Sequence, residues 1–272
     1  MLTIQNYIKA ESLQQAYELN RKKSNRILGG MLWLKMQSGM VTNAIDLSGL
    51  SLDAIEETRE QFSIGCMTTL RRLELHPGLD AYTQGAVRKA LSPIVGVQFR
   101  NLATVGGSLF GRFGFSDVLT VFMAMDSYVE LYQGGIIPLS RFASMPYDDD
   151  ILVRLIIKKT PLSVSYFSHR NTATDLPVLT CAVSKPNGSW QAVIGARPHR
   201  AVLIPDVLGL LNGGITPEAA LSFAAFVQTE TKTGSNTRAS ARFRTHLAGV
   251  LTRRALDPFM RSDSALQGGL LI

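Results

Sequence analysis

The most informative stretch of the sequence is Gln98-Phe99-Arg100-Asn101-Leu102-Ala103-Thr104-Val105-Gly106-Gly107-Ser108. Its glycine pair predicts a turn, because glycine adopts positive φ and lets the backbone approach a ligand closely. Successive backbone N–H groups in such a turn form a nest that binds anions. We therefore expect a loop over residues 101–107, to which Thr104 and Ser108 add hydroxyl groups. A glycine pair taken alone is more often a plain tight turn.

A second glycine pair, Gly29-Gly30, follows the short apolar strand predicted over residues 25–28. Residues 31–36 come next and are expected to be helical or extended. Two nests on separate segments are suited to grip one pyrophosphate from both sides. Neither pair is part of a G-x-G-x-x-G sequence, so a Rossmann dinucleotide site is not supported.

The segment 98–117 resembles a longer signature, QIRNxATxGGN…D, of the FAD-binding subunit of the xanthine dehydrogenase, aldehyde oxidase and carbon monoxide dehydrogenase family. Further segments resemble this family in the same order, namely 27–30, 64–69, 170–177, 195–201, 238–244 and 251–256. The resemblance covers nearly the whole chain. It implies that the protein is the FAD-binding subunit of a molybdenum-containing hydroxylase.

The resemblance implies an α+β fold in two parts. Residues 1–160 are expected to form a two-part FAD-binding domain of the vanillyl-alcohol-oxidase/PCMH type, with subdomains of about 1–55 and 56–160. Residues 161–261 are expected to form a C-terminal flavoprotein domain, a small antiparallel sheet followed by a helix bundle. Residues 262–272 are expected to be a loosely ordered tail.

Hydrophobic periodicity predicts the elements of the first part. Helices are expected over 12–21, 78–92 and 117–125, and strands over 25–28, 43–47, 62–65, 128–132 and 151–157.

Beyond Pro161 the pattern changes to three extended segments, 164–169, 178–184 and 190–195. An Asn187-Gly188 turn joins the last two as a hairpin. Helices over 217–229 and 239–255 complete this part, so we expect a three-stranded sheet with helices.

The resemblance also implies which residues hold FAD. In the family, the two glycine loops wrap the diphosphate and an acid that matches Asp117 contacts the cofactor. An apolar residue that matches Leu152 lies against the flavin, and one that matches Ile94 makes another hydrophobic contact. Asp117 also suits a helix N-cap, and core packing explains the two apolar residues nearly as well. The expected binding residues are Ile27, Leu28, Gly29, Gly30, Met31, Leu32, Trp33, Ile94, Thr104, Val105, Gly106, Gly107, Ser108, Asp117 and Leu152.

Four positions depart from the family pattern. Met31 and Leu32 stand where the family has a polar residue and an acid, and neither replaces a strong hydrogen-bonding group. Ser108 replaces the usual asparagine, and no lysine lies near Phe167, where the xanthine dehydrogenase branch has one near the flavin ring. These departures predict weaker FAD binding or an altered potential. They leave open a flavin-free structural or assembly subunit of the same kind of complex.

The charges and cysteines bound the remaining function classes. The net charge is +7, but the cations are spread along the chain without an aromatic ladder between them, which argues against nucleic-acid binding. An unrelated basic binding module is the third reading. Cys66 and Cys181 lie far apart in the sequence and the four histidines share no metal-ligand spacing, so no metal or iron–sulfur site is expected in this chain.

The function that the resemblance implies is electron transfer. The resemblance implies a molybdopterin-binding large subunit and a [2Fe–2S] small subunit as partners, with FAD in this chain and an acceptor such as NAD. No side-chain nucleophile or general base is expected here, because the isoalloxazine does the redox chemistry. The sequence shows no signal-peptide h-region and no apolar run of membrane-spanning length, so we expect a cytoplasmic protein.

Overall fold

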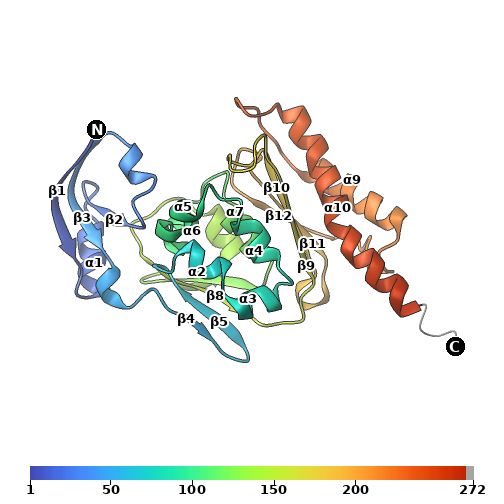
Figure 1. Cartoon of the computed structure of the whole chain (residues 1–272), viewed down its shortest axis with the longest axis horizontal. Coiled ribbons are helices and arrows are strands. Elements are labelled where there is room, and N and C mark those ends of the chain that lie inside the picture. The colour runs from blue at the N-terminus through green and yellow to red at the C-terminus, as the bar shows by residue number, and fades with distance from the viewer. Residues whose placement is uncertain (268–272) are drawn as a thin grey trace.

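The computed structural model describes residues 1–267, with side chains described through Met260. Three β-sheets follow one another along the long axis of the molecule (Figure 1). The N-terminal sheet lies at one end, and the central sheet carries most of the short helices. The C-terminal sheet has two long helices outside it. The α+β class predicted from the sequence is confirmed.

The N-terminal sheet has three parallel strands in the order β1 (Leu2–Lys9), β3 (Gly39–Asp46) and β2 (Arg26–Leu28). Helix α1 (Leu13–Asn20) connects β1 to β2, and the Ser12 side chain caps it by accepting a hydrogen bond from the Gln15 amide. Strand β1 was missed in the sequence because it is exposed along nearly its whole length and its apolar alternation is interrupted at Asn6.

The central sheet has five antiparallel strands in the order β4-β5-β8-β6-β7. The strands are β4 (Ile55–Glu57), β5 (Gln61–Gly65), β6 (Ser127–Leu131), β7 (Gly135–Pro138) and β8 (Leu152–Lys158). The short helices that accompany it are α2 (Leu70–Glu74), α3 (Pro77–Tyr82), α4 (Ala86–Leu91), α5 (Val97–Leu102), α6 (Val105–Phe110), α7 (Asp117–Met123) and α8 (Leu139–Ser144). Helix α7 is buried at every position and lies at the centre of the core.

Two predictions for this part are wrong. The single helix expected over 78–92 is two helices, because Gln84 and Gly85 adopt left-handed conformations with φ of 52° and 81° between α3 and α4. A glycine within a helical pattern often ends a helix in this way. The loop expected over 101–107 is helical at both ends, because α5 runs to Leu102 and α6 begins at Val105.

The C-terminal sheet is antiparallel, in the order β12-β11-β10-β9. Its strands are β9 (Val164–His169), β10 (Leu179–Ser184), β11 (Gln191–Gly195) and β12 (Val202–Pro205). The prediction of three strands missed β12, a short edge strand that ends in a proline.

Helices α9 (Pro217–Glu230) and α10 (Ala241–Gln267) cover one face of the C-terminal sheet. Helix α10 continues through the first residues of the expected tail as far as Gln267, and residues 268–272 lie outside the described part.

The two parts of the molecule share an interface at the other face of the C-terminal sheet. All residues of β10 are buried. Its Ala182 belongs to the central core, whereas Cys181 and Val183 pack toward α9 and α10. Helix α7 contacts β10 and β11, and the hydroxyls of Thr120 and Thr180 lie 2.9 Å apart across this contact. A strand buried on both faces therefore joins the central core to the C-terminal helices.

Candidate cofactor site

The two glycine pairs lie in direct backbone contact. A Cβ atom placed on Gly29 would lie 3.1 Å from the Cα of Gly107, and one placed on Gly107 would lie 2.8 Å from the carbonyl oxygen of Gly29. Larger residues at either position would therefore push the two segments apart. The convergence of the two pairs, expected from the sequence, is present in the fold.

A cavity of about 800 Å³ opens beside this contact. Most of its wall comes from β2 and the loop after it, the region from α5 to the loop after α6, and residues 147–152. The segment before β2, Leu47 after β3, and Cys66 and Met67 after β5 complete it. Ligand sites for organic molecules have volumes of about 300–1,000 Å³, so the space suits a nucleotide-sized ligand. The expected binding residues that line it are Ile27, Leu28, Gly29, Met31, Leu32, Trp33, Thr104, Gly106, Gly107, Ser108 and Leu152.

The remaining expected residues do not line this cavity. Gly30 packs against the Leu102 carbonyl, and Val105 is fully buried in the core. Ile94 and Asp117 face a neighbouring small pocket. The sequence did not single out Asp148, Asp149 and Asp150, which form part of the cavity wall.

The loop after β2 changes the sign of φ between Gly29 and Gly30, as an anion nest does. Gly30 and Met31 adopt successive positive φ values of 86° and 63°. The amides of residues 29–33 donate no hydrogen bond to any other residue within 1–267. Consecutive free N–H groups on such a backbone attract an anion. This loop therefore supplies the amide donors that a diphosphate requires.

The second glycine pair plays a different part from the one expected. The Thr104 hydroxyl caps α6 by accepting from the Gly107 amide at 3.1 Å, and the Gly106 amide donates to the Cys66 carbonyl at 2.7 Å. The Val105 amide donates to the Thr68 carbonyl. A Cβ on Gly106 would lie 2.8 Å from the Cβ of Cys66. These glycines therefore allow α6 to pack closely against Cys66, and they form part of the cavity wall. Their amides already donate hydrogen bonds within the protein.

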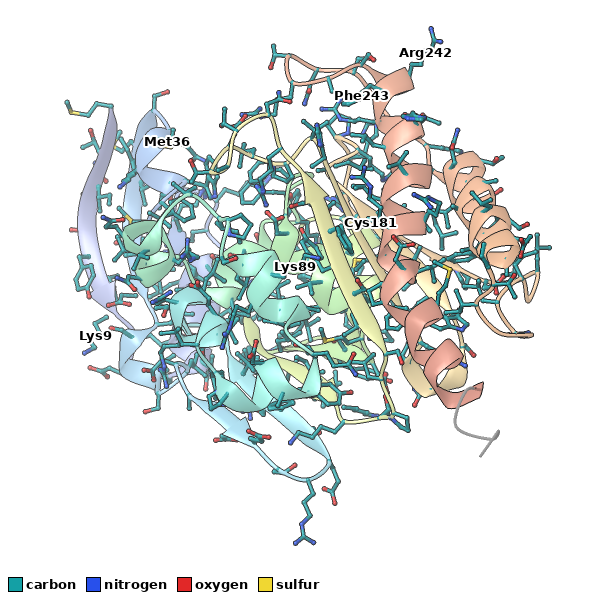
Figure 2. The ribbon with its side chains drawn as sticks, turned by 45° about the vertical axis from the view of Figure 1, so that its right-hand side comes forward. Lys9, Met36, Lys89, Cys181, Arg242 and Phe243 are labelled. Carbon is teal, nitrogen blue, oxygen red and sulfur yellow. The ribbon has the colours of Figure 1, made fainter. Side chains whose placement is uncertain are left out.

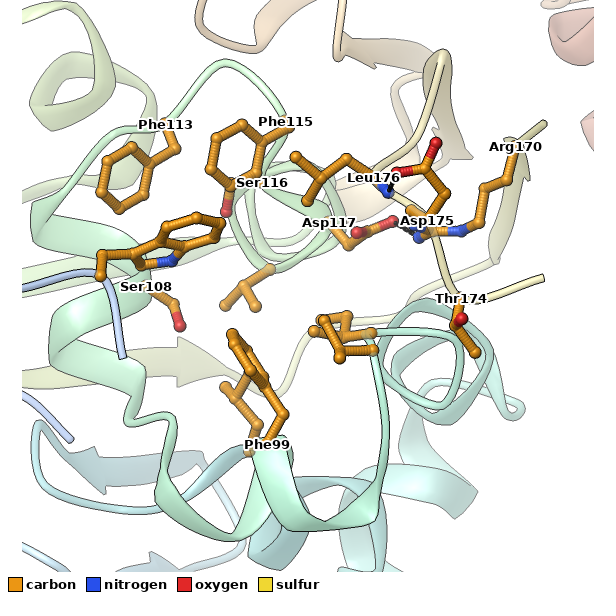
Figure 3. A pocket seen from close by; sticks show the side chains of 15 residues that line it. Phe99, Ser108, Phe113, Phe115, Ser116, Asp117, Arg170, Thr174, Asp175 and Leu176 are labelled. Atoms are coloured by element: carbon orange, nitrogen blue, oxygen red, sulfur yellow. Dashed lines mark hydrogen bonds and ion pairs between the residues drawn. The ribbon is translucent and has the colours of Figure 1, made fainter. Parts of the chain in front are cut away.

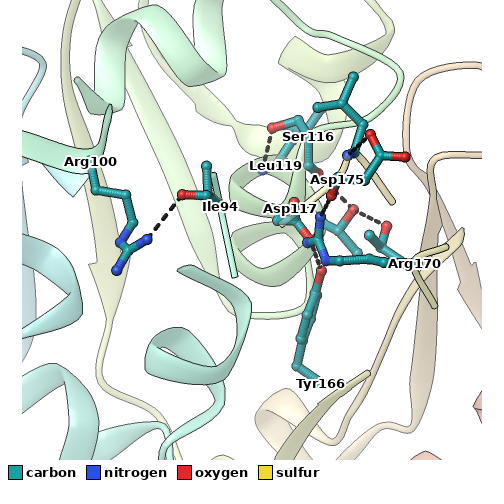
Figure 4. A network of polar contacts seen from close by, with 11 residues as sticks. Ile94, Arg100, Ser116, Asp117, Leu119, Tyr166, Arg170 and Asp175 are labelled. Atoms are coloured by element: carbon teal, nitrogen blue, oxygen red, sulfur yellow. Dashed lines mark hydrogen bonds and ion pairs between the residues drawn. The ribbon is translucent and has the colours of Figure 1, made fainter. Parts of the chain in front are cut away.

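Asp117 lies in a buried polar network between the two parts of the molecule (Figure 4). Its Oδ1 accepts hydrogen bonds from the Tyr166 hydroxyl and the Arg170 guanidinium. Burial raises the pKa of Asp117, and the charge of Arg170 and both hydrogen bonds act in the opposite direction. Burial also raises the pKa of Tyr166 well above its ordinary value, so this phenol stays protonated. The cap of α7 is Ser116, whose Oγ accepts from the Leu119 amide at 3.0 Å.

The small pocket beside the main cavity has a volume of about 50 Å³ (Figure 3). Aromatic rings form one side of it, and the Asp117–Arg170 pair lies at the other. Phe99, Phe113 and Phe115 in this wall were not predicted as site residues. Phe99 lies within the signature stretch 98–108, and this position is the one feature of the sequence that could have identified it as a site residue.

One of the four departures from the family pattern, the absence of a lysine near Phe167, needs correction. The Nζ of Lys89 on α4 lies 3.3 Å from the ring centroid of Phe167 on β9 (Figure 2 shows Lys89 beside this strand). Burial lowers the pKa of Lys89. The expectation of no lysine near Phe167 is therefore wrong, because Lys89 is distant in the sequence and is brought there by packing of α4 on β9.

Neither cysteine belongs to a polar cluster. Cys66 and Cys181 are buried free thiols, and burial raises the pKa of each to about 12. Such groups are protonated and unreactive at neutral pH. Within the described residues, no group of three or more metal-ligating side chains has a geometry suited to a metal ion. None of the helices in residues 1–267 has the length and apolar character needed to cross a bilayer.

Comparison with known proteins agrees with this geometry. The protein YgfM of Escherichia coli strain K12, described as uncharacterized, is 24% identical over 254 residues, which cover 91% of this chain and 93% of that protein. Among solved structures, carbon monoxide dehydrogenase from Hydrogenophaga pseudoflava matches with a TM-score of 0.82 and 20% identity, over 93% of this chain and 96% of that one. Quinoline 2-oxidoreductase from Pseudomonas putida 86 matches with a TM-score of 0.81 and 18% identity, over 94% and 97%. At these identities the structural matches establish the fold.

The family is established by the sequence of the larger part of the chain. Residues 2–160 match the family described as the FAD binding domain in molybdopterin dehydrogenase. This range contains both glycine pairs and every segment that lines the cavity. The chain therefore belongs to the family of FAD-binding domains of molybdopterin dehydrogenases, whose cofactor is FAD.

Proposed function

We propose that this chain is the electron-transfer subunit of a molybdenum hydroxylase complex. In this proposal a large partner subunit carries molybdopterin and a small partner subunit carries [2Fe–2S] clusters. Electrons from these clusters reach FAD in this chain and leave to an acceptor such as NAD. The observation that carries the proposal is the loop of free amides at residues 29–33, which faces a cavity of nucleotide size.

Each wall of the cavity has a distinct role in the proposed site. The amides of residues 29–33 bind the diphosphate, and the packed glycines of α6 hold the opposite wall against it. Leu152 and Ile27 provide apolar surface. Bound FAD supplies an isoalloxazine that accepts and releases electrons, and the protein supplies its position and electrostatic surroundings.

The related structures support the partner assignment. Three neighbours are carbon monoxide dehydrogenases, and one of these is described as lacking the Mo-pyranopterin moiety of its molybdenum cofactor. This chain has two cysteines, and both are buried and unpaired. Iron–sulfur clusters need several cysteine ligands, so the proposal places them on another subunit.

A flavin-free assembly subunit is the second candidate function. It is favoured by Met31 and Leu32, which line the cavity without strong hydrogen-bonding groups, and by the small volume of the pocket beyond them.

An absorbance spectrum of the chain, purified with the subunits that accompany it, distinguishes the two candidates. Electron transfer predicts flavin bands that bleach when the organic substrate of the complex is added and return with the acceptor. Absence of flavin bands, both before and after incubation with FAD, would establish the assembly role instead.

A further inference from the structure

The large cavity and the small pocket meet at four shared side chains, Trp33, Phe99, Ser108 and Phe113. The large cavity, about 800 Å³, has room for the adenosine and diphosphate parts of a dinucleotide. The small pocket, about 50 Å³, holds only a few waters at about 10–15 Å³ each. A three-ring isoalloxazine does not fit into the small pocket as it stands.

The Trp33 indole is the central member of the aromatic group at this junction. Its ring centroid lies 5.2 Å from that of Phe115, 5.8 Å from that of Phe113 and 6.4 Å from that of Phe99. These separations are typical of favourable aromatic contacts. The three phenylalanines come from α5 and from the loop between α6 and α7, whereas Trp33 belongs to the nest loop. The indole therefore connects the diphosphate-binding loop to the wall of the small pocket.

The far side of the small pocket offers polar groups to a ligand. The Arg170 side chain is only 7% exposed, yet its Nε makes no hydrogen bond to any described residue. Asp117 also lines this far side, whereas Ser108 lies at the junction with the large cavity. A buried donor without a partner is costly, and a flat ring with carbonyl and ring-nitrogen acceptors at its edge would satisfy it. The small pocket thus has the chemistry of a ring site but not the volume.

We propose that Trp33 is a specificity-determining residue that separates recognition of the adenine nucleotide half of FAD from recognition of the flavin half. The adenosine and diphosphate bind to the cavity as it stands. The isoalloxazine enters only after the indole leaves the aromatic group and opens the small pocket. This inference rests on the proposed function, because it concerns the same cavity.

Two ligands, ADP and FAD, separate the steps. The sequence contains two tryptophans, and Trp190 lies in the C-terminal core, so Trp190→Phe leaves Trp33 as the only indole emitter. In stopped-flow experiments on the full chain freed of flavin, ADP should bind in one step with little change in Trp33 emission. FAD should change that emission in a second, slower step whose rate becomes independent of FAD concentration.

Trp33→Leu tests the role of the indole directly. Leucine keeps the position apolar and opens the junction, so the slow step should disappear. FAD association, followed by flavin fluorescence, should then accelerate on the order of tenfold, which corresponds to about 1.4 kcal/mol in the barrier. A single cooperative transition in denaturant unfolding confirms that the variant is folded. Trp33→Phe, which keeps a smaller ring, should give an intermediate rate.

The outcomes separate this inference from the function on which it rests. If FAD binds to the wild-type and Trp33→Leu chains at the same rate, or more slowly to the variant, the role of Trp33 is wrong and the FAD site stands. If neither ADP nor FAD binds to the wild-type chain, the proposed function is wrong, and the inference with it.

Discussion

Gly30 meets two constraints that only glycine satisfies. Its φ is 86°, a left-handed conformation, and a Cβ atom there would lie 2.0 Å from the carbonyl oxygen of Leu102. The first constraint favours glycine over other residues by about 1–2 kcal/mol. The second would force the nest loop away from α5. The orientation of the free amides therefore depends on this residue.

Gly30→Ala should therefore remove FAD from the purified protein. Gly135→Ala is the matched control, because Gly135 also has a positive φ, 66°, but no atom lies within 4 Å of its added Cβ. Gly135→Ala should lose about 1–2 kcal/mol of stability in denaturant unfolding, and Gly30→Ala should lose more because its added Cβ also meets the Leu102 carbonyl. Flavin released per chain, measured by absorbance, should fall only in Gly30→Ala. Equal retention in both variants would count against the nest.

Met31 weakens the same loop by its chemistry. Its side chain lines the cavity at a φ of 63° and offers no strong donor or acceptor. Threonine would add a hydroxyl, but it is β-branched and poorly suited to that conformation. Asparagine tolerates it and adds an amide group.

Met31→Asn should lower the dissociation constant of FAD about tenfold, as one additional hydrogen bond of about 1.4 kcal/mol allows. Titration calorimetry on the flavin-free chain measures it, with Met36→Asn as the control, since Met36 is 74% exposed and outside the cavity wall. Weaker binding to Met31→Asn would mean that this side chain does not face the cofactor.

Helix α6 is the element whose position sets the opposite wall. Thr104 caps it, and the same hydroxyl lies close to Gly29. Thr216 caps α9 in the same way, by accepting from the Ala219 amide at 3.1 Å, far from the cavity in the sequence and in the fold. The two threonines therefore separate the effect of a cap from the effect of the site.

Thr104→Ala and Thr216→Ala should each cost about 1 kcal/mol of unfolding free energy. Only Thr104→Ala should also weaken FAD binding, and Thr104→Ser should restore it. Denaturant unfolding and flavin titration provide the two measurements. If Thr216→Ala lost as much FAD affinity as Thr104→Ala, general destabilisation would explain both losses.

Most elements were predictable from the sequence, and the failures have local causes. Strong apolar patterns gave α7, β8 and the hairpin of β10 and β11 within a few residues. Strand β1 was missed because it is exposed, and α6 was mistaken for a loop because its glycines suggest a turn. In the structure, hydrogen bonds from Val105 and Gly106 to the segment at Thr68 and Cys66 hold that helix. Hydrogen bonds between segments that are distant along the chain cannot be predicted from the local sequence.

At the scale of the whole molecule, the Asp117–Arg170 pair joins the central part to the C-terminal part. Both side chains are nearly inaccessible, at 5% and 7% exposure. Asp175 and Arg238 form a second ion pair nearby, with about one third of each side chain exposed. Asp117 was predicted as a site residue from the sequence, but its partner Arg170 was not predicted, because it lies 53 residues away along the chain. The contact of Lys89 with Phe167 escaped prediction for the same reason.

Asp117→Asn should destabilise the protein by about 3–5 kcal/mol, because it leaves the Arg170 charge buried without its counterion. Asp175→Asn removes a partly exposed pair and should cost no more than about 1 kcal/mol. Chemical unfolding of both variants at neutral pH provides the comparison. Similar costs would mean that the buried pair does not hold the two parts together.

The central claim, that the amides of residues 29–33 bind the FAD diphosphate, is tested most directly by amide hydrogen exchange with and without FAD. These amides make no hydrogen bond to described residues, so they should exchange rapidly in the flavin-free chain. At FAD about 100 times its dissociation constant, exchange there should slow on the order of 100-fold. The amides of Val105 to Gly107, already bonded within the protein, should change far less. Rapid exchange at residues 29–33 with FAD bound would contradict the account.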